Sequence, residues 1–199
     1  MFIQNLRAST ADCHKQLELN SLSLALMSDN VNEDIYCNYL NHLYSFVKGF
    51  EEFVYPILSN HFLNISNRKK AFFIEEDLKE YSFSTKEITL IQEQFFREIY
   101  TDIYTAAGAM YVLEGSTLGG QIIIKHLQKT LAPSFKGSAY FSAYHHTTGS
   151  MWKEFLQQLT ALPTTDSEEQ KIITGAIKTF EIINTILSNI SPKITMYEH

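Results

Sequence analysis

Cysteine, proline and glycine are all scarce in this sequence, and each scarcity excludes a class of structure. The 199 residues include two cysteines, four prolines and eight glycines. Cys13 and Cys37 are too few for a disulfide framework, and they match no zinc-site spacing. Asn-Gly and Asp-Gly turns are absent, and alternation of apolar with polar residues is brief, which argues against a protein built from β-hairpins.

Positive charge is also in short supply. Asp and Glu number 22 against 16 Lys and Arg, so the formal net charge is −6 at pH 7. A nucleic-acid-binding protein usually shows a basic face, and this sequence shows none. Arg68, Lys69 and Lys70 form the one basic cluster. We interpret that cluster as a solvent-exposed helix end, because short runs of like charge generally lie on the surface.

Long apolar runs are missing as well. The run from Ala106 to Leu113 stops at Glu114, whereas a membrane-spanning helix needs roughly 20 apolar residues. No basic segment followed by an apolar stretch occurs near the N-terminus, so we identify no signal peptide. These absences predict a cytoplasmic protein that interacts neither with membranes nor with nucleic acid.

Helical periodicity is what the sequence has in abundance. Hydrophobic residues make up 45% of the chain, which fits a globular protein with a buried core. We predict an all-α fold of about seven helices, in a single domain that spans residues 1–199. The predicted helices cover approximately residues 3–19, 31–60, 67–80, 85–99, 101–131, 148–162 and 165–192.

Capping boxes and prolines set the predicted helix boundaries. A polar N-cap residue followed three positions later by Glu occurs at Asn30–Glu33, Ser84–Glu87 and Thr165–Glu168. Pro56 is expected to kink the second helix, because proline lacks the N–H donor of a regular helix. The other prolines are expected to end the helices before them, at Pro133, Pro163 and Pro192.

One predicted helix is unusually rich in glycine. Half of the eight glycines fall between residues 108 and 120, at Gly108, Gly115, Gly119 and Gly120. Each glycine inside a helix costs about 1 kcal/mol relative to alanine, so a helix that accepts several must gain something in return. Gly115 and Gly119 are one turn apart and share a face, which Gly108 and Tyr111 continue as a stripe.

Three interpretations of this stripe compete. A phosphate-binding loop is disfavoured, because the Lys-Ser/Thr pair of a P-loop and a preceding strand are both missing. A close contact between two helices through small residues is the second interpretation. We favour the third, in which the bare backbone lies against a ligand, with Tyr111 at one end and a bend at Gly119-Gly120.

The first predicted helix carries a candidate metal ligand. His14 shares a mostly apolar face with Leu6 and Thr10. Glu18, one turn further on, is placed to accept the Nδ1 proton of His14, which leaves Nε2 free for a metal. Arg7 stands two turns before His14 at nearly the same azimuth, where a guanidinium suits a ligand carboxylate. This combination suits a porphyrin with propionates.

The remaining histidines lack such support. His145 and His146 are adjacent and point to different faces of any helix, which favours a surface position. No Glu-x-x-His pair occurs, which argues against a di-iron bundle. No metal-ligand pattern accompanies the others, at His42, His61, His126 and His199.

These features together resemble the haem oxygenase family, in particular its bacterial biliverdin-producing members that are associated with bacteriophytochromes. Three blocks carry the resemblance. They are Leu-Arg-x-x-Thr-x-x-x-His-x-x-Leu-Glu over residues 6–18, Tyr-Val-Leu-Glu-Gly-Ser-x-Leu-Gly-Gly-Gln over 111–121, and Tyr-Phe-Ser-x-Tyr with Thr-Gly-x-x-Trp-x-x-Phe over 140–155. The second block is the most specific, and the blocks follow the family's order.

The resemblance implies that haem b is both cofactor and substrate, held between a proximal and a distal helix. His14 would be the iron ligand and Glu18 its hydrogen-bonded partner. Ordered water and a serine on the distal helix would deliver protons. The implied catalytic positions of that helix are Gly115, Ser116, Gly119 and Gly120.

The resemblance also implies other contacts and partners. Arg7 and Lys178 would contact the haem propionates, with Lys153 as a third candidate, and Thr10 and Tyr111 would line the haem site. No Cys-x-x-Cys-His motif occurs, so the haem would be held without thioether bonds. A ferredoxin or flavoprotein reductase would supply electrons. Biliverdin, iron and carbon monoxide would be released, and a biliverdin-using phytochrome would be a downstream partner.

Two positions depart from the family pattern. Ser116 stands where better-known members carry an aspartate that organises water, and Glu114 lies about 200° round the helix from it and cannot replace that group. His145 stands where many relatives have glycine. The change at Ser116 keeps an alternative open, a haem-binding carrier or sensor of the same fold without turnover. A helical interaction module without haem is a third hypothesis.

Overall fold

The computed structural model describes residues 2–83, 91–132 and 134–188, and these ranges contain helices and turns but no β-strand. The predicted all-α fold is therefore confirmed. Nine α-helices occur in the described ranges: α1 (Phe2–Glu18), α2 (Ser21–Leu26), α3 (Glu33–Gly49), α4 (Tyr55–Leu58), α5 (Ala71–Glu80), α6 (Glu93–Ile99), α7 (Ile103–Thr130), α8 (Thr148–Ala161) and α9 (Asp166–Leu187). Short 3₁₀ turns follow α4 and precede α8, at Ile65–Arg68 and His145–Thr147.

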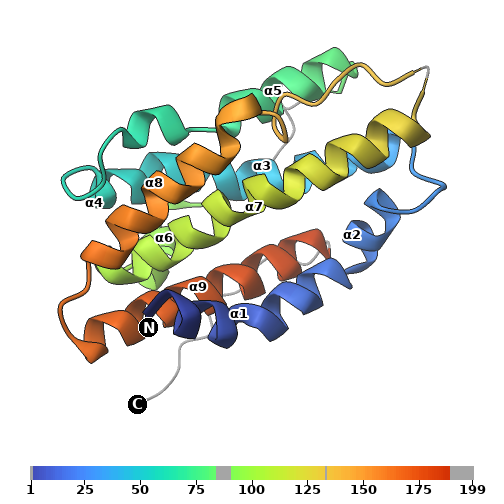
Figure 1. Ribbon diagram of the computed structural model, residues 1–199. Coiled ribbons are helices and arrows are strands. Elements are labelled where there is room, and N and C mark those ends of the chain that lie inside the picture. Colours follow the sequence, from blue (N-terminus) through green and yellow to red (C-terminus); the bar gives the residue numbers. More distant parts are fainter. Residues whose placement is uncertain (1, 84–90, 133, 189–199) are drawn as a thin grey trace.

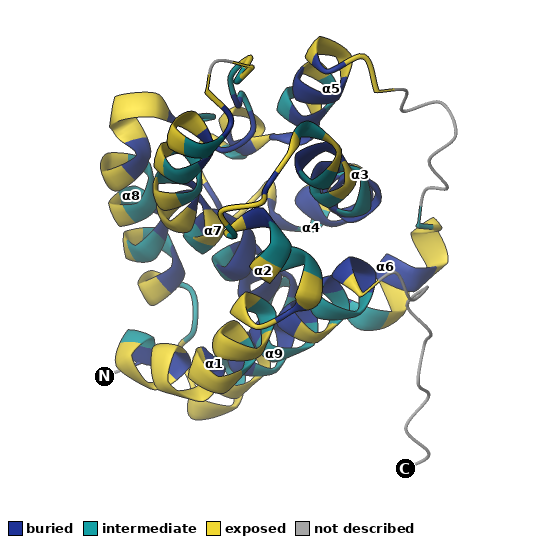
Figure 2. Ribbon diagram, turned by 90° about the vertical axis from the view of Figure 1, so that its right-hand side faces the viewer, coloured by how far each residue is buried: buried dark blue, intermediate teal, exposed yellow. Residues whose placement is uncertain are grey.

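Helix α7, with 28 residues, runs through the middle of the molecule (Figure 1). Helices α1 and α9 lie side by side on one side of it, and α8, α4 and α5 lie on the other (Figure 1). Exposed residues cover the outer faces of the helices and buried residues the inner ones (Figure 2). Helix α1 has few buried residues, Phe2, Leu6 and Thr10 among its 17, so most of this helix lies outside the core.

Pro56 lies where the regular α-helix is interrupted. A π-helical segment, Phe50–Val54, joins α3 to α4, and Pro56 occupies the first turn of α4. Because proline has no N–H to donate, the hydrogen-bonding pattern of the preceding turn must change there. The predicted second helix is thus one continuous run with a change of pitch. The prediction missed α2, because six residues are too few to show a helical period.

The helix caps agree with the prediction in part. The capping box at Thr165–Glu168 is confirmed at the start of α9. The predicted cap at Asn30 is wrong, because Asn32 caps α3 by accepting a hydrogen bond from the N–H of Ile35 at 2.9 Å. A further capping box, formed by Asp102 and Thr105, opens α7. The predicted box at 84–87 and the predicted stops at Pro133 and Pro192 lie outside the described residues.

Gly108 and Gly175 allow α7 and α9 to cross in direct contact. A Cβ atom on Gly108 would lie 2.1 Å from the carbonyl oxygen of Ile172, and one on Gly175 would lie 2.1 Å from that of Thr105. No side chain fits at either position. The prediction that Gly108 continues the ligand-facing stripe is therefore wrong, and a close helix contact explains this glycine. Further along α7 the same face borders a cavity, which Tyr111 and Gly115 line.

Candidate functional site

A cavity of about 660 Å³ lies between α1 and α9 on one side and α7, α8 and the loop after α7 on the other. Small-molecule sites span roughly 300–1,000 Å³, so this volume suits a sizeable ligand. Most of the lining is apolar or aromatic. The hydrophobic side chains that line it include Leu17, Tyr39, Leu43, Tyr111, Val112, Leu113, Leu118, Ile123, Tyr140, Phe141, Trp152, Phe180 and Ile183.

Helix α1 presents an imidazole to this cavity. His14 lines it, and 60% of the His14 side chain is exposed although the surrounding wall is apolar. The Nδ1 atom of His14 lies 3.6 Å from Oε1 of Glu18, which is longer than a hydrogen bond and needs a small rotation to become one. The ring of Phe180 from α9 packs edge-on against His14, with 5.7 Å between centroids. This contact limits the rotation of the imidazole.

Cations and a buried hydroxyl accompany His14 along α1. Arg7, Thr10 and Lys15 all line the cavity. Thr10 is buried, and its hydroxyl donates to the carbonyl oxygen of Leu6 at 2.8 Å, so this side chain contributes a methyl group and a satisfied oxygen. Arg7 and Lys15 are exposed and can reach the cavity rim. The other predicted cations, Lys153 and Lys178, do not line the cavity.

Helix α7 forms the opposite wall, with parts of the glycine-rich block. Gly115 and Ser116 line the cavity. A Cβ atom on Gly115 would make ordinary contact with the Trp152 ring at 3.6 Å. Gly119 is exposed, and a Cβ atom there would meet nothing within 4 Å, so the backbone is bare at this position. Gly119 and Gly120 are not among the lining residues.

Several wall residues were not singled out from the sequence. Tyr39 of α3, Tyr140 of the loop after α7, Trp152 of α8 and Phe180 of α9 all line the cavity. Tyr140 and Trp152 stand inside the third block of the family resemblance, which was a usable signal. Tyr39 carries no local pattern, because aromatic residues are spread through most of this core.

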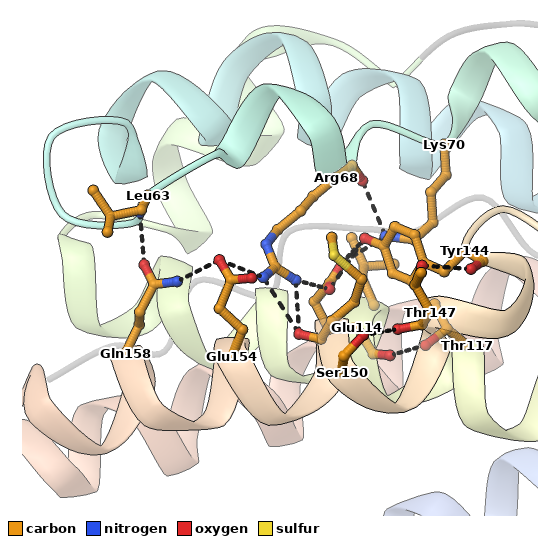
Figure 3. A network of polar contacts seen from close by, with 12 residues as sticks. Leu63, Arg68, Lys70, Glu114, Thr117, Tyr144, Thr147, Ser150, Glu154 and Gln158 are labelled. Carbon is orange, nitrogen blue, oxygen red and sulfur yellow. Dashed lines mark hydrogen bonds and ion pairs between the residues drawn. The ribbon is translucent and has the colours of Figure 1, made fainter.

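On its far side, α7 carries a buried ionic network (Figure 3). Glu114 is 1% exposed and forms ion pairs with Arg68 and Lys70, the Lys70 Nζ lying 2.5 Å from Glu114 Oε1. The hydroxyl of Tyr144 donates to the same Glu114 oxygen at 2.8 Å. Arg68 also donates to the carbonyl oxygen of Met151 on α8 at 3.3 Å. The network thus connects α7, α8 and the segment between α4 and α5.

This network corrects the interpretation of the basic cluster. Arg68 and Lys70 are 0% and 4% exposed, so they do not form a solvated helix end, and only Lys69 of the three lies on the surface. Two buried cations beside one buried carboxylate need further acceptors. The main-chain oxygens of Met151 and Arg68 supply them, the latter accepting from Lys70 Nζ at 3.0 Å.

The pKa values of two groups beside this network are shifted. Burial, and then the nearby charge of Glu114, raise the pKa of Tyr144, so this phenol stays protonated and donates. Burial raises the pKa of Glu51, while the N–H groups of Lys70 and Ala71 act against that rise. The N–H of Ala71 donates to Glu51 Oε1 at 2.9 Å. Glu51 therefore fixes the chain at the start of α5.

Five other histidines belong to the described residues and none of them lines the cavity, namely His42, His61, His126, His145 and His146. His145 and His146 are exposed, as predicted. His145 has φ of +44°, a conformation that favours glycine. Among the described residues, no group of three or more His, Cys, Asp or Glu side chains is placed to hold a metal ion. None of the described helices is long and apolar enough to cross a membrane.

Comparisons with known proteins agree on one family. A family model described as heme oxygenase matches residues 1–189. A search of curated protein sequences found no match. Several solved structures are similar to this chain. The heme oxygenase from Leptospira interrogans superposes with a TM-score of 0.82 at 22% identity, over 95% of this chain and 99% of that one.

Two further structures give the same result. Heme oxygenase-1 from the cyanobacterium Synechocystis, solved in complex with heme, has a TM-score of 0.78 at 18% identity, over 94% of this chain and 91% of that one. The NO- and CO-bound heme oxygenase from Neisseria meningitidis has a TM-score of 0.70 at 23% identity, over 98% and 95%. At such identities the superpositions establish the fold. Because the family model matches residues 1–189 of 199, this chain belongs to the haem oxygenase family.

Proposed function

We propose that this haem oxygenase binds haem b in the cavity between α1 and α7 and cleaves it to biliverdin, with release of iron and carbon monoxide. One observation carries the proposal. An imidazole, His14, is 60% exposed and faces a cavity of about 660 Å³ whose lining is mostly apolar or aromatic, with Arg7 and Lys15 on the same helix. A flat aromatic macrocycle with a central metal and two carboxylates matches such a cavity in shape, in polarity and in its cationic rim.

In this proposal His14 Nε2 is the protein ligand to iron. Among the described residues none forms a hydrogen bond with Nε2, whereas Nδ1 faces Glu18. A hydrogen bond from Nδ1–H to the carboxylate would fix the tautomer that leaves Nε2 unprotonated, and it would make the imidazole a better donor to a metal. The edge-on contact with Phe180 limits the rotation of the imidazole.

Arg7 and Lys15 are proposed to bind the carboxylates of the ligand. Both are exposed residues of α1 that line the cavity, so their charged groups can pair with propionates at the cavity rim. Lys15 takes the place that the sequence assigned to Lys178, which does not line the cavity. A propionate contact to Lys178 stays a prediction that depends on movement of its side chain.

When bound, haem supplies the iron that activates oxygen, and its own ring is the substrate. The α7 wall orients the ring and excludes bulky molecules, and Gly115 leaves that wall without a side chain, whereas Gly119 does not line the cavity. Ser116 lines the cavity, but its hydroxyl donates to the carbonyl oxygen of Leu113 at 2.8 Å. Ser116 therefore offers acceptor lone pairs to water, and it donates a proton only after leaving Leu113.

The external partners are also proposals. Turnover needs electrons from a ferredoxin or a flavoprotein reductase, and a biliverdin-using phytochrome of a bacterium is a suitable recipient of the product. These proteins place the reaction in the cytoplasm. The net charge of −6 gives no reason to expect nucleic acid as a partner.

Titration of the purified protein with haem tests the iron ligand. The unsubstituted protein should give a sharp Soret band, and His14→Ala should shift or weaken it and reduce turnover strongly, with partial recovery on adding imidazole. His61→Ala serves as the matched control, because His61 is exposed and does not line the cavity. An unchanged spectrum and full activity in His14→Ala would contradict the assignment.

A second measurement separates the enzyme from a carrier. Addition of a reductant and a ferredoxin-type donor to the haem complex should convert the Soret band into the broad red absorption of biliverdin. A haem complex that stays intact under these conditions would support the alternative function, a carrier or sensor without turnover.

A further inference from the structure

The loop after α7 is held against the core by a buried carboxylate. Asp77 of α5 is 4% exposed. It accepts hydrogen bonds from the N–H of Ala139 at 2.6 Å and from the N–H of Tyr140 at 2.9 Å. The hydroxyl of Tyr36 donates to Asp77 at 2.8 Å and lies 2.7 Å from the Ser138 hydroxyl. Asp77 thus fixes the two successive N–H groups that lead into Tyr140.

Gly120 brings the same loop directly onto α7. A Cβ atom at this position would lie 3.1 Å from both the ring and the carbonyl oxygen of Phe141, which is tighter than ordinary contact. The Gln121 side chain donates to that carbonyl oxygen at 3.4 Å. Gly120 therefore does not border the cavity itself, and it makes room for the loop residue that follows Tyr140.

These two constraints place the Tyr140 ring in the cavity wall beside Ser116, and both residues line the cavity. Tyr140 is buried, with 6% of the residue exposed. Burial and then the neighbouring Tyr39 raise the pKa of Tyr140, so its phenol keeps its proton at neutral pH. The Ser116 proton is directed at Leu113. The phenol is consequently the better placed donor of the pair.

We propose that Tyr140 is the hydrogen-bond donor of the wall opposite His14, that it acts on small anionic or polar ligands bound there, and that Asp77 positions it. This inference rests on the proposed function, because it concerns the side of the haem that faces α7. It assigns to Tyr140 part of the task that the sequence pattern assigned to Ser116.

Ligand binding to the haem complex tests the proposal without turnover. Azide is a hydrogen-bond acceptor and binds ferric haem, whereas carbon monoxide binds ferrous haem and accepts hydrogen bonds poorly. Tyr140→Phe should weaken azide binding roughly 3- to 10-fold, the loss expected for one hydrogen bond, and should change carbon monoxide affinity less than about 2-fold. Tyr104→Phe is the matched control, because Tyr104 lies outside the cavity lining.

Three outcomes contradict different claims. A normal Soret band with unchanged azide affinity in Tyr140→Phe would overturn the role of Tyr140 and leave the proposed function standing. Absence of a Soret band in the unsubstituted protein would overturn the proposed function and this inference with it. A loss of azide affinity in Ser116→Ala alone, with none in Tyr140→Phe, would return the donor role to Ser116.

The positioning role of Asp77 is tested in two backgrounds. Asp77→Asn should weaken azide binding in the unsubstituted protein but cause no further loss in Tyr140→Phe, because it acts through that phenol. Equal losses in both backgrounds would show that Asp77 does not act through Tyr140. If Asp77→Asn fails to fold, Gly120→Ala takes its place, since a methyl group there displaces Phe141 and hence its neighbour.

Discussion

Glycine has two different uses along α7. Gly108 lies where α7 meets α9, and an added Cβ atom there would overlap the backbone of the other helix. Gly119, three turns away, has open space where a Cβ atom would lie. The first glycine is required by packing, and the second leaves the backbone uncovered. A stripe of glycines is therefore not one feature, although the residues share one face of the helix.

Alanine substitutions separate these two uses at Gly119 and at Gly175, which lies opposite Gly108 where α7 and α9 cross. Gly119→Ala should raise the stability of the haem-free protein by up to about 1 kcal/mol, because alanine is the better helix former. Gly175→Ala should lower it by at least about 1–3 kcal/mol, because the methyl group overlaps the Thr105 carbonyl. If the bare backbone contacts haem, Gly119→Ala should also weaken haem binding. Thermal melts and haem titrations measure both effects, and a destabilised Gly119→Ala would contradict this account.

Residues whose partners lie one or two turns away could be predicted from the sequence. His14 and Glu18 are one turn apart on α1, so helical spacing alone predicted this pair, and both line the cavity. Ser116, next to Gly115 on α7, was identified by the family resemblance and not by spacing. Tyr140 could not be found in this way. Its position depends on Asp77, 63 residues earlier, and on the approach of Phe141 to Gly120. No local pattern encodes such contacts.

At the scale of elements, the capping box at the start of α9 follows the sequence closely, whereas the box predicted at Asn30–Glu33 is replaced by a cap at Asn32. Thr165 accepts a hydrogen bond from the N–H of Glu168, and the Glu168 side chain accepts hydrogen bonds from Thr164 and Thr165. The hydroxyl of Tyr104, in the first turn of α7, donates to the same carboxylate. The cap of α9 therefore also joins the starts of the two helices that cross at Gly108.

The Glu168 cap should make stability depend on pH. The Tyr104 hydroxyl, and then the groups of Thr164, lower the pKa of Glu168 to about 2. An unfolded glutamate titrates near pH 4.3. Because the folded pKa is the lower one, the stabilisation is fully present above about pH 4.3 and is lost as the pH falls towards 2. Glu168→Gln should lower the melting temperature by a few degrees at pH 6, and this difference should shrink between pH 4 and pH 2.

The control for this experiment is Glu181→Gln on the same helix, which lies outside the capping box. Its difference from the unsubstituted protein should not follow the same pH course. A Glu168→Gln difference that stays constant from pH 6 to pH 2 would show that the carboxylate charge does not stabilise the cap.

For the whole molecule, contacts between distant segments decide where α7 lies, and these were the least predictable. Arg68 and Lys70 look like surface charge in the sequence, yet they pair with Glu114, 46 and 44 residues later in the chain. Glu114 in turn adjoins Gly115 in the cavity wall. The family block over 111–121 thus combines a wall on one face of the helix with an anchor on the other.

Removal of the anion tests how much the fold depends on this anchor. Glu114→Gln keeps the size of the side chain but removes the buried carboxylate that pairs with both Arg68 and Lys70, and Arg68 retains its longer ion pair with Glu154 at 3.6 Å. Breaking a buried pair from one side typically costs about 3–5 kcal/mol, so the free energy of unfolding should fall by about that amount. Glu93→Gln is the matched control, because its pair with Arg97 is exposed, with 46% and 71% of the side chains accessible. That loss should stay below about 1 kcal/mol. Urea unfolding curves measure both, and equal small losses would show that α7 is held in place by its apolar contacts alone.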